Sequence, residues 1–136
     1  MTGFDGPATA DTNIAVYAFA TDRRTPAAAA ALRSCAFLSV QVLNEYANVA
    51  FRKRDDPWDL IAGDVAAIRA AVPSILPVDD GANREAIRIT HRYQLSFYDA
   101  LMLAVALRGG ARIIYSEDMH HDLVIDQTLR ILDPFR

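Results

Sequence analysis

Apolar residues in the segment 41–54 recur at intervals of three and four residues. Val42, Tyr46, Val49 and Ala50 fall on one side when this segment is wound as an α-helix. Further helices are predicted from one of three signals: a run of alanines, a proline suited to a first helical turn, or the same periodicity. These helices are expected around 27–31 and at 57–72, 80–94 and 97–109, the last ending at a pair of glycines.

Short apolar runs separate the predicted helices and have the length of buried strands. They occupy 36–40, 74–78, 112–115 and 129–132. Each is expected to follow a helical segment, and alternation of this kind predicts an α/β fold with a mainly parallel sheet and helices on both faces. Such sheets bind ligands beyond the carboxyl ends of their strands. The segment 6–10 is less apolar, so a strand there is expected to be short or distorted.

Length and composition are those of one domain spanning 1–136. The chain has 136 residues, of which 52% are hydrophobic, and it contains no repeat or linker. No apolar stretch approaches the ~20 residues of a membrane-spanning helix, and nothing near the start has the pattern of an export signal. We therefore expect a cytoplasmic protein with no membrane segment. Its one cysteine, Cys35, is expected to pack as a small hydrophobe.

Two acidic residues occupy positions in predicted helices where apolar neighbours favour burial. Glu45 shares a helix face with Val42 and Val49, and Asp99 has similar surroundings. Each has an alternative interpretation without a binding role. Glu45 at the edge of the apolar stripe would reach water, and Asp99 lies three residues after Ser96, as in a capping box.

Two further acids adjoin apolar runs. Asp11 lies just before the run 14–20, and Asp118 follows the predicted strand 112–115. Either one alone is explained by a turn or a helix cap. Together with Glu45 and Asp99, however, they would converge at one sheet edge. Carboxylates about 4 Å apart repel by roughly 1 kcal/mol in water and 4 near a protein surface, so such a cluster favours a hard divalent cation, magnesium or manganese.

Four short motifs carry these acids in a fixed order. They are Asp11-Thr12-Asn13-Ile14, Leu38-Ser39-Val40-Gln41-Val42-Leu43-Asn44-Glu45, Ser96-Phe97-Tyr98-Asp99-Ala100-Leu101 and Ser116-Glu117-Asp118-Met119, followed by Asp133-Pro134-Phe135. With these motifs the chain resembles a PIN-domain ribonuclease over about residues 11–135, and specifically the VapC-type toxin of a toxin-antitoxin pair. The resemblance implies a three-layer sandwich of parallel strands between helices.

The resemblance also implies a site and a reaction. The reaction would be magnesium- or manganese-dependent hydrolysis of phosphodiester bonds in RNA by an endoribonuclease. The implied catalytic acids are Asp11, Glu45, Asp99 and Asp118, with Asp11, Asp99 and Asp118 as metal ligands and Glu45 binding directly or through water. Hydrogen bonds from Thr12, Asn13 and Ser116 would steady these carboxylates.

One departure from the family pattern concerns a further acid after the fourth motif. Many relatives carry it where this chain has His120 and His121, which leaves Glu117 or Asp122 as substitutes. The adjacent histidines are expected to lie in a solvated turn, since neither has a partner at metal-site spacing.

The expected partners are RNA, a small antitoxin whose basic segment covers the acidic groove, and a second copy in a homodimer; the last two are implied by the resemblance alone. The net charge is −3, so any RNA contact must be local. Two basic groups are candidates, although a solvated surface is the favoured interpretation of both. They are Arg52-Lys53-Arg54 and the stripe Arg84, Arg88 and Arg92.

Two other functions compete with RNA cleavage. The alternative within the family is a PIN-fold binding module with little turnover that acts through its antitoxin complex. A phosphatase or receiver-like domain is disfavoured, because Lys53 is the only lysine in the sequence and does not lie where such a site needs one.

Overall fold

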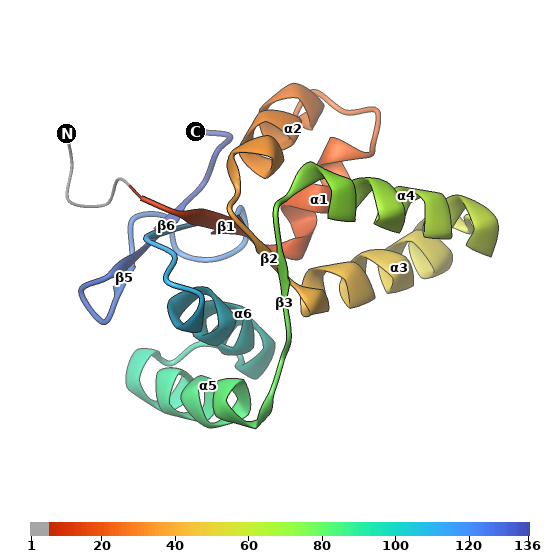
Figure 1. Cartoon of the computed structure of the whole chain (residues 1–136). Helices are drawn as coiled ribbons and strands as arrows, with labels where there is room; N and C mark the ends of the chain where they lie inside the picture. The colour runs from red at the N-terminus through yellow and green to blue at the C-terminus, as the bar shows by residue number, and fades with distance from the viewer. Residues whose placement is uncertain (1–5) are drawn as a thin grey trace.

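The computed structural model describes residues 6–136, which form short strands enclosed by helices. The strands are β1 (Ala8–Ala10), β2 (Leu38–Ser39), β3 (Ile75–Leu76), β4 (Ile113–Tyr115), β5 (Val124–Ile125) and β6 (Leu129–Leu132). The helices are α1 (Thr12–Ala18), α2 (Thr25–Ser34), α3 (Val40–Arg54), α4 (Trp58–Ala71), α5 (Asp80–Tyr93) and α6 (Phe97–Arg108). Helices α1 to α4 lie on one side of the strands and α5 and α6 on the other (Figure 1). The predicted α/β architecture is confirmed.

Four strands form the main sheet in the order β1-β4-β6-β5. The β1–β4 and β4–β6 pairs are parallel, and only the β5–β6 pair in this sheet is antiparallel. Strands β2 and β3 form a separate parallel pair. Hydrogen bonds from Ala36 N to Ala8 O (2.8 Å) and from Thr9 Oγ1 to Phe37 O (2.7 Å) attach the segment before β2 to β1. The mainly parallel arrangement therefore extends across both groups of strands.

The expectation that every strand follows a helix is wrong for β6. Strand β6 instead follows β5 in a tight hairpin, closed by a hydrogen bond from Thr128 N to Ile125 O (2.9 Å). The two turn residues, Asp126 and Gln127, have φ angles of 51° and 58°. A turn with two such residues usually has Asn-Gly or Asp-Gly, so Asp126-Gln127 is not a recognisable hairpin signal.

Local capping interactions set the starts of the helices that matter for the site. The Ser39 side chain accepts a hydrogen bond from Gln41 N at the start of α3, and Ser96 accepts one from Asp99 N at the start of α6. Pro57 is the N-cap of α4 rather than its first helical residue. Helix α6 has a buried run from 100 to 106, which anchors the helix in the core, while Asp99 in its first turn stays partly exposed.

Buried apolar side chains from all layers form one core. Cys35 is 3% exposed, as expected for a packed hydrophobe, and burial raises the pKa of its thiol to about 12. The strand before Asp11 is indeed short, with three residues. In the part of the chain that the structure describes, no helix has both the length and the apolar character required to cross a bilayer.

Candidate metal and active site

Four carboxylates line one open pocket with a volume of about 240 Å³. Asp11 follows β1, Asp118 follows β4, Glu45 lies in α3, and Asp99 is in the first turn of α6. Strands β1 and β4 are parallel neighbours, so their carboxyl ends meet at one edge of the sheet. Thr12, Asn13, Asn48 and Val49 complete the pocket. The structure thus brings together the four acids that the sequence singled out.

Asp11 is the most buried of the four acids, with 8% of its surface exposed. Its Oδ1 accepts a hydrogen bond from Thr12 N (2.7 Å), and its Oδ2 accepts one from Ser116 Oγ (3.1 Å). The pKa of Asp11 is raised to about 6: burial is the largest cause, the two hydrogen bonds oppose the rise, and the charges of Asp99 and Glu45 add to it. The protein therefore holds an anionic oxygen pair in place at considerable electrostatic cost.

Two donors fix the carboxylate of Glu45. Thr12 Oγ1 donates to Glu45 Oε1 (2.6 Å), and Gln41 Nε2 donates to Glu45 Oε2 (3.0 Å). Glu45 is half-buried and lines the open pocket, so its carboxylate reaches water from the edge of the apolar stripe while both of its oxygens accept hydrogen bonds. Thr12 joins two of the acids, because its backbone bonds Asp11 and its side chain bonds Glu45.

Asp118 and Asp99 complete the acidic face. Asn13 Nδ2 donates a short hydrogen bond to Asp118 Oδ2. Burial raises the pKa of Asp118, and the charges of Glu117 and Asp99 act in the same direction. The backbone of Asp99 takes part in the Ser96 cap, while its side chain lines the pocket. The Ser96 half of the capping box is therefore present, and it leaves the Asp99 side chain at the pocket.

The residues of the pocket fit a hard divalent cation by chemistry. Their donors are carboxylate, hydroxyl and amide oxygens, which magnesium and manganese prefer, and these ions usually keep several waters. Burial is the largest cause of the raised pKa of Asp11 and Asp118, and a cation would offset the repulsion between carboxylates that adds to it. Within residues 6–136, however, no three His, Cys, Asp or Glu side chains already stand close enough together to hold one ion.

The two candidate additional acids are used elsewhere. Glu117 forms an ion pair with Arg24 (3.2 Å between Nε and Oε1), and Asp122 is paired with Arg130. Neither side chain lines the pocket, although the charge of Glu117 still raises the pKa of Asp118. Glu117 is therefore an electrostatic neighbour of the four acids rather than a fifth member of the group.

The expectation of a solvated histidine turn holds for one residue of the pair. His120 is exposed. His121 is partly buried, because its Nδ1 accepts a hydrogen bond from Asp133 N (2.9 Å) and its Nε2 lies 3.3 Å from Asp122 Oδ2. His121 thus holds the C-terminal segment, a long-range role that sequence spacing does not reveal.

Sequence reasoning missed three residues at the site, all on α3. Asn48 and Val49 line the pocket, and Gln41 donates to Glu45. Gln41 lies four residues before Glu45, and Asn48 and Val49 lie three and four residues after it, so all three share its helix face. The helical spacing from Glu45 points to all three, and it already places Val49 on the face of Glu45 as an apolar neighbour rather than as a pocket residue.

Comparison with known proteins defines the class. The sequence matches the PIN domain family over residues 8–124, and the chain therefore belongs to that family. One similar solved structure is a toxin-antitoxin complex from Klebsiella pneumoniae, with a TM-score of 0.71 and 18% identity, covering 93% of this chain and 97% of that one. Another is VapC20 of Mycobacterium tuberculosis, a Sarcin-Ricin loop cleaving toxin, with a TM-score of 0.64 and 25% identity over 82% and 89% of the two chains. No curated protein sequence gives a significant match. The predicted resemblance to VapC-type PIN domains is confirmed.

Proposed function

We propose that this PIN domain is a magnesium- or manganese-dependent endoribonuclease and the toxin of a toxin-antitoxin pair, acting in the cytoplasm. The observation that carries the proposal is the convergence of Asp11, Glu45, Asp99 and Asp118 in one open pocket. The similarity to VapC20, which is described as a Sarcin-Ricin loop cleaving toxin, supports RNA as the substrate. An open pocket suits a phosphodiester within a long chain, since both ends of the strand can leave it.

Asp11, Asp99 and Asp118 are the proposed metal ligands, with Glu45 beside them. A bound divalent ion would polarise the phosphate and activate a water at neutral pH. The protein's part is to hold the four carboxylates in position before substrate arrives, so that no reorganisation is needed during the reaction. Ser116, Thr12 and Asn13 do this for Asp11, Glu45 and Asp118 respectively through the hydrogen bonds that they donate.

The test compares the wild-type chain with Asp99→Asn on total cellular RNA, in magnesium or manganese and in chelator. The substitution keeps the shape of the side chain and removes its charge. We expect discrete fragments from the wild type with metal, and a loss of at least roughly 100-fold in cleavage rate in Asp99→Asn, the size typical of losing a catalytic electrostatic group.

Asp59→Asn is the matched control, because Asp59 is an exposed acid on α4 outside the pocket. It should cleave RNA at the wild-type rate. Equal cleavage by Asp99→Asn and wild type would contradict the proposed site and indicate a contaminating nuclease. No cleavage by any folded variant, with metal binding intact, would favour the binding-module alternative.

The proposed protein partner is a small antitoxin whose basic segment covers the acidic groove. The similarity to a chain of a toxin-antitoxin complex supports this partner, and the acidic pocket suits a basic segment. Inhibition of cleavage by an added antitoxin, relieved in high salt, would support the basic contact.

We also propose a homodimer. Light scattering on the purified chain tests the dimer, and a monomer at micromolar concentration would contradict it.

A further inference from the structure

A second hollow lies beside the acidic pocket, along the same face of α3. It has a volume of about 340 Å³ and is lined by Asn48, Val49, Arg52 and Lys53. Asn48 and Val49 also line the acidic pocket, so the two hollows are adjacent. The four lining residues follow Glu45 at helical spacing. Anionic and cationic side chains therefore succeed one another along one face of α3.

Arg52 and Lys53 carry free positive charge. Both are exposed, and within residues 6–136 neither forms an ion pair with a carboxylate. Their neighbour Arg54 differs, because it is held by Asp56 (3.2 Å) and by the hydroxyl of Tyr46 (2.7 Å). The two cations are therefore available to an external anion, whereas Arg54 belongs to the fold.

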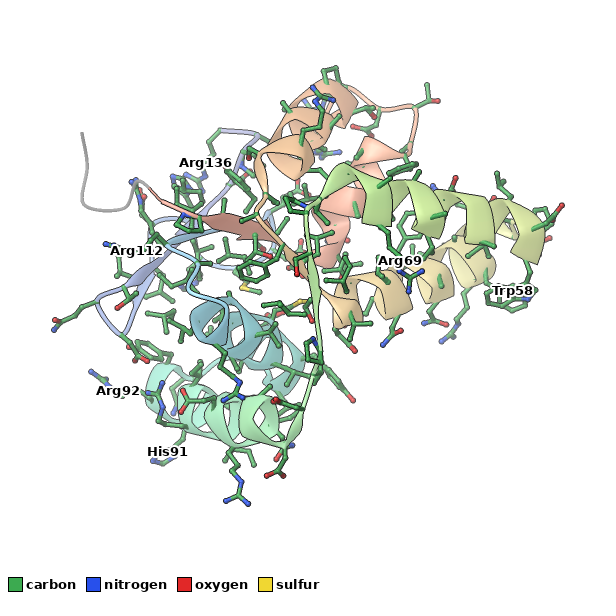
Figure 2. The ribbon with its side chains drawn as sticks, viewed as in Figure 1. Trp58, Arg69, His91, Arg92, Arg112 and Arg136 are labelled. Atoms are coloured by element: carbon green, nitrogen blue, oxygen red, sulfur yellow. The ribbon has the colours of Figure 1, made fainter. Side chains whose placement is uncertain are left out.

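The other basic group predicted from the sequence is engaged within the protein. On α5, Arg84 pairs with Asp80 (2.9 Å), Arg88 pairs with Glu85 (2.8 Å) and with Asp126, and Arg92 lies over the ring of Tyr93. Figure 2 shows Arg92 on the opposite side of the view from Trp58, which marks the start of α4 near the end of α3. In this stripe Arg84 and Arg88 are thus paired with carboxylates, and the stripe is remote from the α3 surface.

The second hollow, called the cationic hollow because Arg52 and Lys53 line it, would offset the negative charge of the acidic pocket. Four carboxylates repel a polyanion such as RNA, and the chain has a net charge of −3, so binding needs local compensation. Arg52 lies seven residues after Glu45, about 10 Å along the helix axis at 1.5 Å per residue. This distance is too long for an ion pair with the acids and short enough for contact with a phosphate next to the one in the pocket.

We propose that Arg52 and Lys53 bind backbone phosphates of the RNA strand on one side of the bond that is cut, with Asn48 lying between them and the acids. The proposal rests on the proposed function for its substrate. It assigns the cationic hollow to phosphate contact and makes no claim about base sequence, because phosphate contacts position a strand without reading it.

The test measures binding rather than cleavage. A fluorescent single-stranded oligoribonucleotide is titrated with protein in chelator, so that no cutting follows, over a range of salt concentrations. The measurement is repeated with magnesium in the Asp99→Asn background. Each phosphate contact on a single strand contributes about 0.7 to the slope of log affinity against log salt. The double variant Arg52→Ala/Lys53→Ala should therefore lower the slope by about 1.4 and weaken binding roughly tenfold or more near 50 mM salt.

Two control variants separate charge from folding. Arg52→Lys/Lys53→Arg keeps both charges and should retain the wild-type slope. Arg33→Ala removes an exposed arginine on α2 outside both hollows and should also leave the slope unchanged. Circular dichroism verifies that every variant is folded.

The outcomes distinguish this proposal from the proposed function. An unchanged slope in Arg52→Ala/Lys53→Ala, or no RNA binding by the wild type at low salt, would overturn the phosphate site even if Asp99-dependent cleavage is observed. A lowered slope in a protein that never cleaves RNA would support the phosphate site and contradict the nuclease.

Discussion

At the scale of single residues, the buried charge of Asp11 lowers the stability of the folded protein at neutral pH. Its folded pKa of about 6 lies above the ordinary value of 3.8, so the folded state binds this proton more tightly than the unfolded state. Stability from this group is therefore complete below about pH 4, is lost as pH rises to about 6, and changes little above that. The loss amounts to about 3 kcal/mol, since one pKa unit corresponds to ~1.4 kcal/mol.

We expect Asp11→Asn to be more stable than wild type at pH 7 in chelator, by up to about 3 kcal/mol, because the amide carries no charge to bury and Asn caps helices as well as Asp. The gain should vanish near pH 4, where wild-type Asp11 is protonated. Urea denaturation at both pH values measures it. A destabilised variant at pH 7 would show that the hydrogen bond from Ser116 outweighs the buried charge.

At the scale of elements, a partly buried polar contact connects α3 to α4. Tyr46 on α3 is fully buried; its hydroxyl donates to Asp64 Oδ2 on α4 (2.7 Å) and accepts from Arg54 Nη2 (2.7 Å). Tyr46 directly follows Glu45, so this contact also supports the helix that carries one of the four acids. Its ring packs edge-on against Phe19.

Tyr46→Phe should lower the free energy of unfolding by about 1.5 to 3 kcal/mol, the range for hydrogen bonds to charged groups. The ring and its contact with Phe19 remain. Tyr98→Phe is the matched control, because Tyr98 is exposed, and it should cost little. Urea denaturation monitored by circular dichroism tests both. A loss no larger than that of Tyr98→Phe would mean that water replaces the hydroxyl without cost.

At the scale of the whole molecule, metal binding should be linked to folding. The four acids come from segments as far apart in sequence as Asp11 and Asp118, so an unfolded chain cannot gather them and an ion stabilises only the folded state. At a metal concentration 100 times the dissociation constant the gain is about 2.7 kcal/mol. For a domain of this size we expect a rise of several degrees in melting temperature.

Thermal unfolding with and without magnesium or manganese measures this linkage. The rise should shrink below pH 6, because protons then compete for Asp11, and it should be largely absent in Asp99→Asn. An equal rise in wild type and Asp99→Asn would place the stabilising ion somewhere other than the acidic pocket.

Much of the candidate site was predictable because its signals are local. Glu45 and Asp99 stand at helix positions where apolar neighbours lie three or four residues away, and Ser39 and Ser96 cap the helices that carry them. These relations depend on residues within one turn of each other, so the sequence itself predicted helices α2 to α6, the order of the acids and most strand positions, but not α1.

Tertiary structure decided how those elements meet. The division of the strands into two groups and the β5–β6 hairpin arise from strand pairing. Asp126 and Gln127 adopt a turn conformation that their residue types do not predict. The engagement of Glu117 with Arg24, and the free charge of Arg52 beside the pocket, likewise depend on segments distant in sequence. Local periodicity contains no information about such partners, because they are chosen only when the layers pack.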